Sequence, residues 1–262
     1  MTDYKNIRFS VERGIATLTM NRPENLNAVN LEMLDELLRA IFSSTNNRDV
    51  RVIILRGEGR AFSSGGDIKV MEKMIHEDAY DFMRDWIHRV HLLEIQLRTI
   101  PKPVIASVHG IASGQGMNMA LACDLRIASE SASFNQSFVR LGLTSEGTYF
   151  LSRLVGVGKA TELFFTGDTL TAAEALSLGI VNRVVPDDKL EVETMKWASR
   201  MASGPTEALG RTKLLINSGY RNQLDQHLAQ ESTLIAETAR TADFKEAVRA
   251  FLEKREPNFR GF

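Results

Sequence analysis

Two glycine-rich turns in this 262-residue chain carry the groups best suited to do chemistry. The strand-like segment 52–56 leads into the turn 57–67 and then into a helix. The apolar segment 103–108 leads in the same way into the turn 109–116, followed by a helix of small and apolar residues. N–H groups at the start of a helix have no partner inside the helix and lie at the positive end of its dipole. Each turn is therefore suited to stabilise an anion, or an oxygen that becomes negative during a reaction.

The occurrence of two such turns in one alternating strand and helix pattern is more informative than either turn alone. Together they predict an oxyanion hole with two backbone donors, one from each turn. The alternative is that both are ordinary connections between a strand and a helix, in which the glycines serve only tight geometry.

Composition and charge exclude several classes of protein. With 32 Lys and Arg against 33 Asp and Glu, the net charge is −1, so no general positive field favours binding to nucleic acid or to an anionic membrane. We expect no membrane segment, because no apolar run approaches the length of a bilayer span. The first residues resemble no targeting signal, and the one cysteine, Cys123, cannot form an internal disulfide. A cytoplasmic protein is therefore expected, with Cys123 packed in the core.

The order of elements predicts an α/β fold. Segment 7–20 alternates around Gly14 and predicts a β-hairpin, and a helix is expected from Leu31. The stretch 68–98 is expected to be long and helical. Further strands are predicted at 103–108, 124–129 and 132–134, which favours a mainly parallel sheet. From about residue 157 onward the chain is predicted to be mostly helical.

Several segments resemble one known family, in its order and spacing and over nearly the whole chain. On this resemblance the chain is identified as a member of the crotonase superfamily, also called the enoyl-CoA hydratase/isomerase family. The segments are Asn21-Arg-Pro with Asn27-Ala28, Ala61-Phe-Ser-Ser-Gly-Gly-Asp-Ile-Lys69, Pro101-Lys-Pro-Val-Ile-Ala106, Gly110-Ile-Ala-Ser-Gly-Gln-Gly116, Leu121-Ala-Cys-Asp-Leu-Arg-Ile-Ala128, Phe164-Phe-Thr-Gly167-Asp168, Ala172-Ala-Glu-Ala175 with Gly179-Ile-Val-Asn-Arg-Val184, and Phe251-Leu-Glu-Lys-Arg-Glu-Pro-Asn-Phe259.

The resemblance implies a spiral of ββα turns. It implies a core over residues 1–200 that holds the thioester site, and a C-terminal helical region over 201–262 that makes trimer contacts. The implied assembly is a homotrimer or a hexamer built from two trimers. The implied substrate is an acyl-CoA thioester whose oxygen binds the N–H groups of Gly66 and Gln115. Coenzyme A enters as part of the substrate, and no separate cofactor is expected.

The acids near the turns bear on the reaction. Hydratases of this family carry two glutamates that activate water, and their positions are occupied here by Asn118 and Phe138. Ordinary hydration is therefore disfavoured. The next loop, Leu141-Gly-Leu-Thr-Ser-Glu146, resembles the Gly-Leu-x-x-acid motif of the family's Δ3,Δ2-enoyl-CoA isomerases and of its ring-opening oxepin isomerases. A single carboxylate suffices to move a proton from C2 to C4, and Glu146 is its candidate. The alternative is that Glu146 is a solvated loop residue.

The leading hypothesis is an isomerase that shifts the double bond of an acyl-CoA, of the Δ3 to Δ2 type or on a thioester derived from a ring or epoxide. Such an enzyme would serve fatty acid or aromatic acid metabolism. Two alternatives stay open. One is a hydratase, or another lyase or decarboxylase of the family, with an altered site. The other is a member that binds acyl-CoA without turning it over.

Substrate-binding residues follow from the resemblance. It places Arg22 and Lys69 near coenzyme A, and Lys254 near its phosphates from the same or an adjacent subunit. Asp67, which is expected to cap the following helix, and Ile68 flank the first turn, while Asn118 and Phe138 flank the acyl group. The stripe of Met71, Met74, Phe82, Met83 and Trp86 is expected to line the acyl pocket, or else to be plain core.

No metal or nucleotide cofactor is expected from the sequence. His88 and His91 lie three residues apart on an expected helix, but the sequence offers no evident third ligand. Gly114-Gln-Gly116 lacks the third glycine and the acid of a dinucleotide-binding fingerprint, so NAD is not expected.

Overall fold

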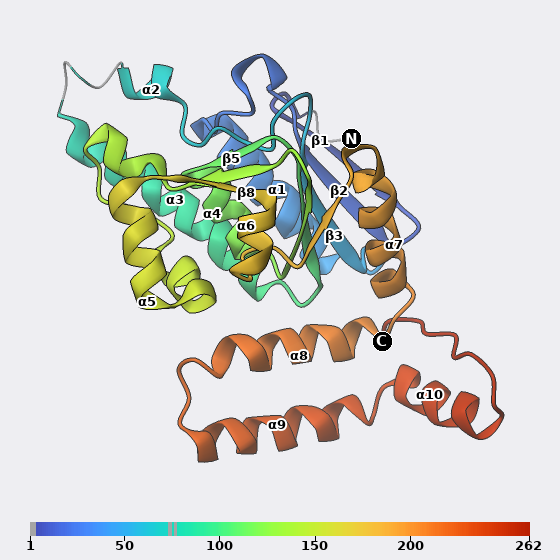
Figure 1. Cartoon of the computed structure of the whole chain (residues 1–262). Coiled ribbons are helices and arrows are strands. Elements are labelled where there is room, and N and C mark those ends of the chain that lie inside the picture. Colours follow the sequence, from blue (N-terminus) through green and yellow to red (C-terminus); the bar gives the residue numbers. More distant parts are fainter. Residues whose placement is uncertain (1–3, 73–74, 76–77) are drawn as a thin grey trace.

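A sheet of six strands forms the centre of the computed structural model, which describes residues 4–72, 75 and 78–262 (Figure 1). The strands β1 (Ile7–Glu12) and β2 (Ile15–Met20) form an antiparallel hairpin, as predicted. Its two-residue turn has positive φ at Arg13 and Gly14, the conformation that tight hairpins require. Beyond β2 the neighbouring strands pair in parallel, in the order β3 (Val52–Gly57), β4 (Val104–Val108), β6 (Leu125–Ser129) and β9 (Arg183–Val185).

The central strands are apolar on both faces because helices cover both sides of the sheet. On one face, alternate residues such as Leu18 and Leu55 pack with α1 (Leu31–Asn46) and α3 (Ala79–Thr99) in the main core. On the other face, Ile54, Ile105 and Ile127 pack with α7 (Leu190–Ala202). Continuous apolar strands of this kind are typical of a parallel sheet inside an α/β layer structure.

A second, smaller sheet links the two glycine turns. It consists of β5 (Ile111–Ser113), β7 (Ser133–Asn135) and β8 (Thr169–Thr171). Ser63, in the first turn, donates its N–H to Ile111 O at 3.0 Å and accepts from Ser113 N at 3.0 Å. The first turn is thereby hydrogen-bonded to the strand that precedes α4 (Gln115–Ala122).

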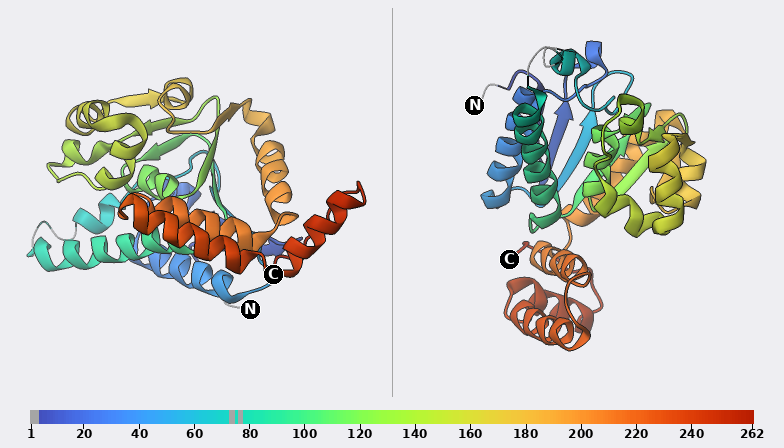
Figure 2. Two further views of the ribbon diagram at one scale, coloured as in Figure 1. Left: turned by 90° about the horizontal axis from the view of Figure 1, so that it is seen from below. Right: turned by 90° about the vertical axis from the view of Figure 1, so that its left-hand side faces the viewer.

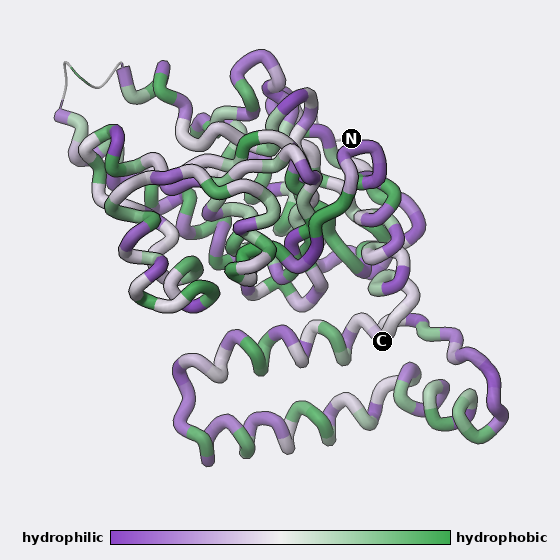
Figure 3. The backbone as a smooth tube through the Cα atoms, in the orientation of Figure 1, coloured by the Kyte–Doolittle hydropathy of each residue, from purple (hydrophilic) through white to green (hydrophobic). Residues whose placement is uncertain are grey.

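The C-terminal helices form a layer of their own beneath the core (Figure 2). The helix α8 (Thr206–Ser218) is attached to the core by Lys213, whose Nζ lies 2.7 Å from Asp124 Oδ2 and also donates to Leu97 O at 2.7 Å. Apolar side chains along this layer are exposed, including Ile235 at 66 % and Phe251 at 83 %. Figure 3 shows hydrophobic positions recurring along these helices. The remaining helices are α2 (Ile68–Glu72), α5 (Thr148–Thr166), α6 (Ala172–Ser177), α9 (Leu224–Thr238) and α10 (Ala242–Leu252), with short 3-10 turns at Pro23–Asn25, Ser137–Leu141 and Asp187–Lys189.

The α/β fold with a helical C-terminus is as predicted. The described part of the stretch 68–98 is mainly helical, as expected, and contains α2 and α3, which begins at Ala79. The Asp78 side chain accepts a hydrogen bond from Tyr80 N at 3.0 Å and caps the N-terminus of α3. Across the described helices, no segment combines the length and apolar character needed to cross a membrane.

Candidate active site

The two glycine turns lie against each other, and where they meet each has an N–H group without a protein partner among the described residues. Within the described residues, neither Gly66 N nor Gln115 N donates a hydrogen bond to another protein group. A Cβ added to Gly65 would lie 2.8 Å from Ser113 O and 3.6 Å from Gln115 N, so glycine is needed for this approach. Gln115 is the first residue of α4, where the N–H groups point away from the helix.

Glutamine at position 115 imposes no backbone strain. The positive φ of this turn falls on Gly114, at 49°, and Gln115 is not among the residues with positive φ. The donor is a main-chain group, so its side chain is free to vary. The Gln115 side chain instead lies over the first turn, with Oε1 3.5 Å from the position that a Cβ on Gly66 would occupy.

A small cavity of about 60 Å³ lies where the two turns meet. Gly66 and Gln115 both line it, and apolar side chains complete its wall. Ligand sites are typically about 300–1,000 Å³, so an acyl chain needs flexible wall residues to move. Three of the five expected methionine and aromatic residues are in this wall, whereas Phe82 packs edge-on against Trp86 and Met74 lies outside the described residues. The apolar wall includes Met71, Met83, Trp86 and Phe138.

Glu146 is buried, contrary to the reading of a solvated loop residue. Only 9 % of it is exposed. The following residue, Gly147, has φ 77°, and a Cβ there would lie 2.0 Å from Asn118 Oδ1. Glycine therefore lets the loop approach α4 so that Glu146 sits beside Asn118. The Asn118 Oδ1 atom accepts from Gln136 Nε2 at 2.8 Å, which leaves its Nδ2 group available to Glu146.

Glu146 lies behind the cavity rather than in its wall. Among the described residues that line the cavity, neither Glu146 nor Asn118 is included. Asn118 lies three residues beyond Gln115 on α4 and connects the two places. Asn118, the neighbour of Glu146, thus lies about one helical turn from Gln115 along α4.

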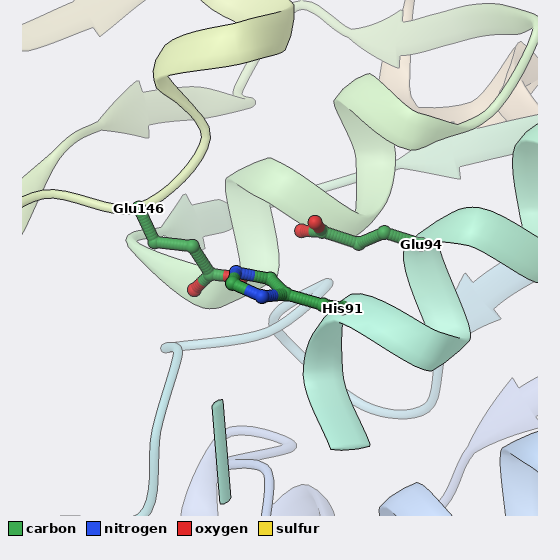
Figure 4. Close-up of side chains that lie close together, drawn as sticks. All are labelled: His91, Glu94 and Glu146. Atoms are coloured by element: carbon green, nitrogen blue, oxygen red, sulfur yellow. The ribbon is translucent and has the colours of Figure 1, made fainter. Parts of the chain in front are cut away.

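A second buried acid, Glu94, faces Glu146 and was not predicted from the sequence. Glu94 is 5 % exposed and belongs to α3. His91, one turn earlier on α3, is exposed at the same place. One ligand atom from each of His91, Glu94 and Glu146 lies within 4.8 Å of the other two, and the side chains point toward a common space (Figure 4). The sequence offered no evident third ligand for the pair His88 and His91, and the fold brings two acids that are distant or unremarked in the sequence to His91.

Burial changes the protonation of both acids. Loss of solvation raises the pKa of Glu146 from 4.5 to about 7, while the neighbouring side chains of Glu94 and Asn118 oppose that rise. Loss of solvation, together with the neighbouring charge of Glu146, raises the pKa of Glu94 to about 10. Burial and the nearby His88 lower the pKa of His91. Burial therefore favours the neutral form of both acids, and the pKa of Glu94 is raised further than that of Glu146.

Polar atoms that lack a protein partner are concentrated here. Among the described residues, nine buried side-chain N or O atoms have none, and seven of them belong to this region. Each such atom costs roughly 1–3 kcal/mol of stability, so their concentration in one place marks a functional site. The residues that carry them are Trp86, Glu94, Gln115, Asn118, Gln136 and Glu146.

Two of the residues that were expected to contact coenzyme A form an ion pair with each other instead. Arg22 forms an ion pair with Asp67 at 2.8 Å. Asp67 caps α2 as expected, since its Oδ1 accepts from Lys69 N at 3.1 Å. These two residues hold the first turn in shape. Ile68 and Lys69 are exposed beside it.

Lys254 is not brought to this site within one chain. It follows α10, which lies in the C-terminal layer away from α2, α3 and α4 (Figure 1). A role for Lys254 toward coenzyme A therefore requires an adjacent subunit and stays a prediction.

A larger cavity, of about 640 Å³, lies elsewhere. It is bounded by α7 and by the opposite face of the sheet, including Ile54, Ser107 and Ser129. Its described lining residues include neither Gly66 nor Gln115, so its size does not make it the site of thioester chemistry.

Comparison with known proteins agrees with this geometry. The enoyl-CoA hydratase/isomerase family matches residues 10–261. The chain belongs to the enoyl-CoA hydratase/isomerase family. It is an enzyme of this family on the strength of that match, and the sequence resemblance to the crotonase superfamily is confirmed.

Relatives within the enoyl-CoA hydratase/isomerase family carry different activities. The chain is 35 % identical to the trans-2-decenoyl-[acyl-carrier-protein] isomerase of Streptococcus mutans over 99 % of both chains. It is 38 % identical to the short-chain-enoyl-CoA hydratase of Clostridium acetobutylicum over 97 % of both. A crystal structure of a putative enoyl-CoA hydratase from Streptomyces coelicolor A3(2) superposes with a TM-score of 0.95 at 33 % identity, covering 100 % of this chain and 96 % of that one. Similarity alone thus leaves isomerase and hydratase open.

Proposed function

We propose that the protein is an isomerase of enoyl thioesters that moves a double bond from C3 to C2. The N–H groups of Gly66 and Gln115 hold the thioester oxygen, which becomes negative as the C2 proton leaves. Glu146 takes that proton and returns it at C4. Coenzyme A forms the thioester, and the acyl group enters between the apolar walls of the cavity. A thioester derived from a ring or an epoxide would react by the same proton transfer.

The observation that carries this proposal is the acid found beside the oxyanion site. Glu146 is buried next to Asn118, and loss of solvation raises its pKa to about 7, which suits a general base near neutral pH. The two positions at which family hydratases carry glutamates hold Asn118 and Phe138. A single base is sufficient for a proton shift, whereas hydration requires water to be both held and activated.

Hydration is the second candidate, and one feature favours it. Glu94 supplies another carboxyl group within 4.8 Å of Glu146, so the pair could hold a water between an acid and a base. A member of the family that only binds acyl thioesters is disfavoured, because buried acids with a raised pKa beside a cavity are typical of catalytic sites.

Turnover of two substrates separates the candidates. We expect the protein to convert a 3-enoyl-CoA to its 2-enoyl isomer much faster than it hydrates crotonyl-CoA. Both reactions are followed by the absorbance of the conjugated thioester, which appears in the first and disappears in the second. Because the Streptococcus mutans relative is named for an acyl-carrier-protein substrate, the 3-enoyl group is offered on that carrier as well. Hydration of crotonyl-CoA without isomerisation would contradict the proposal.

We also propose that the chain assembles as a trimer or a hexamer through its C-terminal layer. Exposed apolar side chains on α9 and α10, such as Ile235 and Phe251, support this. Light scattering at micromolar concentration is expected to give the mass of three or six copies of the 29.3 kDa chain. A mass of one chain that persists at that concentration would contradict it.

A further inference from the structure

Glu94 and Glu146 form a pair of buried acids from separate parts of the chain. Glu94 comes from α3 and Glu146 from the loop before α5, with 5 % and 9 % of their surfaces exposed. Their oxygens approach within 4.8 Å (Figure 4). Within the described residues, Oε1 of Glu94 and both oxygens of Glu146 accept no hydrogen bond from a conventional donor.

A buried carboxylate without hydrogen-bond donors is strongly destabilised. The groups that act on Glu146 are Glu94 and the Asn118 amide, and no described cation contributes to the pKa of either acid. On the solvent side the pair faces His91, behind which lies His88, and burial and His88 both lower the pKa of His91. His91 therefore provides little positive charge at neutral pH. Besides the Asn118 Nδ2 group, a protonated Glu94 is then a further neutral donor placed beside the buried carboxylate of Glu146.

We propose that Glu94 is the positioning residue of the catalytic base: it keeps a proton and donates a hydrogen bond to the charged carboxylate of Glu146. This proposal rests on the proposed function, in which Glu146 is the base. In the reaction the C2 proton moves to Glu146, and the same proton moves on to C4, so Glu94 ends each cycle with the proton it had at the start. Its task is to keep Glu146 charged before each transfer.

The pKa values are consistent with this division of roles. Glu94 has the higher pKa of the two, and its hydrogen bond lowers the pKa of Glu146 against the opposing effect of burial. If Glu94 were instead ionised, its charge would repel that of Glu146 and raise the pKa of the base. The two arrangements therefore predict opposite effects when Glu94 is replaced.

Two substitutions of similar length separate these effects. In Glu94→Gln the amide still donates a hydrogen bond, whereas in Glu94→Met the donor is lost and an apolar chain replaces it. The readout is the rise of kcat/KM for 3-enoyl-CoA with pH, which follows deprotonation of the base. We expect Glu94→Gln to leave the midpoint of this rise within about 0.3 pH units of the wild type. We expect Glu94→Met to move it upward by about one unit, the effect of one hydrogen bond to a charged group.

The pH midpoints measured for the two variants either support or overturn the proposal. An upward shift in Glu94→Met that Glu94→Gln does not show supports it, because a merely structural role would not depend on a donor. A downward shift in both variants would show that Glu94 is ionised and overturns it. An unchanged midpoint in Glu94→Met would overturn it as well.

A second measurement needs no enzymatic activity. Because the pKa of Glu94 is raised in the folded protein, its contribution to stability is complete below about pH 4.5 and is lost as the pH rises through the folded value. We therefore expect the wild type to lose thermal stability between pH 7 and 10 relative to Glu94→Gln. Parallel curves for the two proteins would show that Glu94 holds no proton and would overturn the proposal. If the wild type instead fails to isomerise, the proposed function fails while this comparison still decides the state of Glu94.

His91, Glu94 and Glu146 are also residue types that bind metal ions, so a metal titration is part of the test. Zn²⁺ or Mn²⁺ is titrated against the unfolding midpoint of the wild type and of Glu94→Gln. We expect no saturable rise in either protein. A saturable rise in the wild type that is lost in Glu94→Gln would make His91, Glu94 and Glu146 a metal site and would overturn the proton-sharing pair.

Discussion

Glu146→Gln is expected to lower the rate of isomerisation by about a hundredfold to ten-thousandfold. The amide has nearly the size and polarity of the acid but cannot accept the C2 proton. Binding of the CoA thioester should change little, because the carboxylate acts mainly in the transition state. The measurements are kcat for 3-enoyl-CoA and the dissociation constant of a non-reactive acyl-CoA.

The matched control is Glu130→Gln, the same change at an exposed glutamate away from the cavity. It should retain the wild-type rate. Wild-type kcat in Glu146→Gln would mean that another group carries the proton and that the loop has been assigned wrongly.

Gly66→Pro is expected to lower kcat by about a hundredfold or more. Proline removes the N–H group of the first turn, and the loss of one preorganised oxyanion donor typically costs about 2.7–4 kcal/mol of barrier. The folded structure should survive, because among the described residues this N–H has no acceptor to lose. Circular dichroism and the unfolding midpoint check this before kcat is compared.

Gly66→Ala keeps the N–H group and therefore serves as the control. Its Cβ would come within 2.7 Å of the terminal methyl of Met71, a flexible side chain that can move aside. We expect a modest change in KM and a much smaller loss of kcat than in Gly66→Pro. A folded Gly66→Pro enzyme with the activity of Gly66→Ala would contradict the role of this donor.

Most strands of the large sheet could be predicted because their hydrophobic patterns are clear in the local sequence. The hairpin around Gly14 and the parallel strands β3 and β4 follow from alternation and from apolar runs next to glycine turns. The strands β5 and β8 were not predicted, because three residues are too few to show the alternation of apolar and polar residues that indicates a strand. Their pairing is decided by tertiary contacts.

The start of α3 at Ala79 was not located from the sequence for a different reason. Apolar residues recur at helical spacing in both α2 and α3, so the pattern does not mark where α3 begins. The signal that was available is Asp78, an acid followed by a helix-compatible run, which caps α3.

The candidate site likewise combines features that are visible in a short stretch of sequence with contacts that form only when the chain folds. The two turns are local features, and the family resemblance assigns the donors Gly66 and Gln115 to them. Glu94 was missed because its partner Glu146 is distant along the chain. A signal was nevertheless present, since Glu94 lies within the buried stripe of α3 formed by Trp86, Val90 and Leu97. An acid in an apolar stripe is seldom buried unless it is paired.

The most direct test of the central claim follows one hydrogen atom. A 3-enoyl-CoA labelled with deuterium at C2 is converted by the wild type in ordinary water, and the product is examined by NMR. The account predicts the 2-enoyl isomer with part of the deuterium at C4, because Glu146 removes and returns the same proton. The isomer formed with no deuterium at C4, or a 3-hydroxyacyl product in its place, would contradict it.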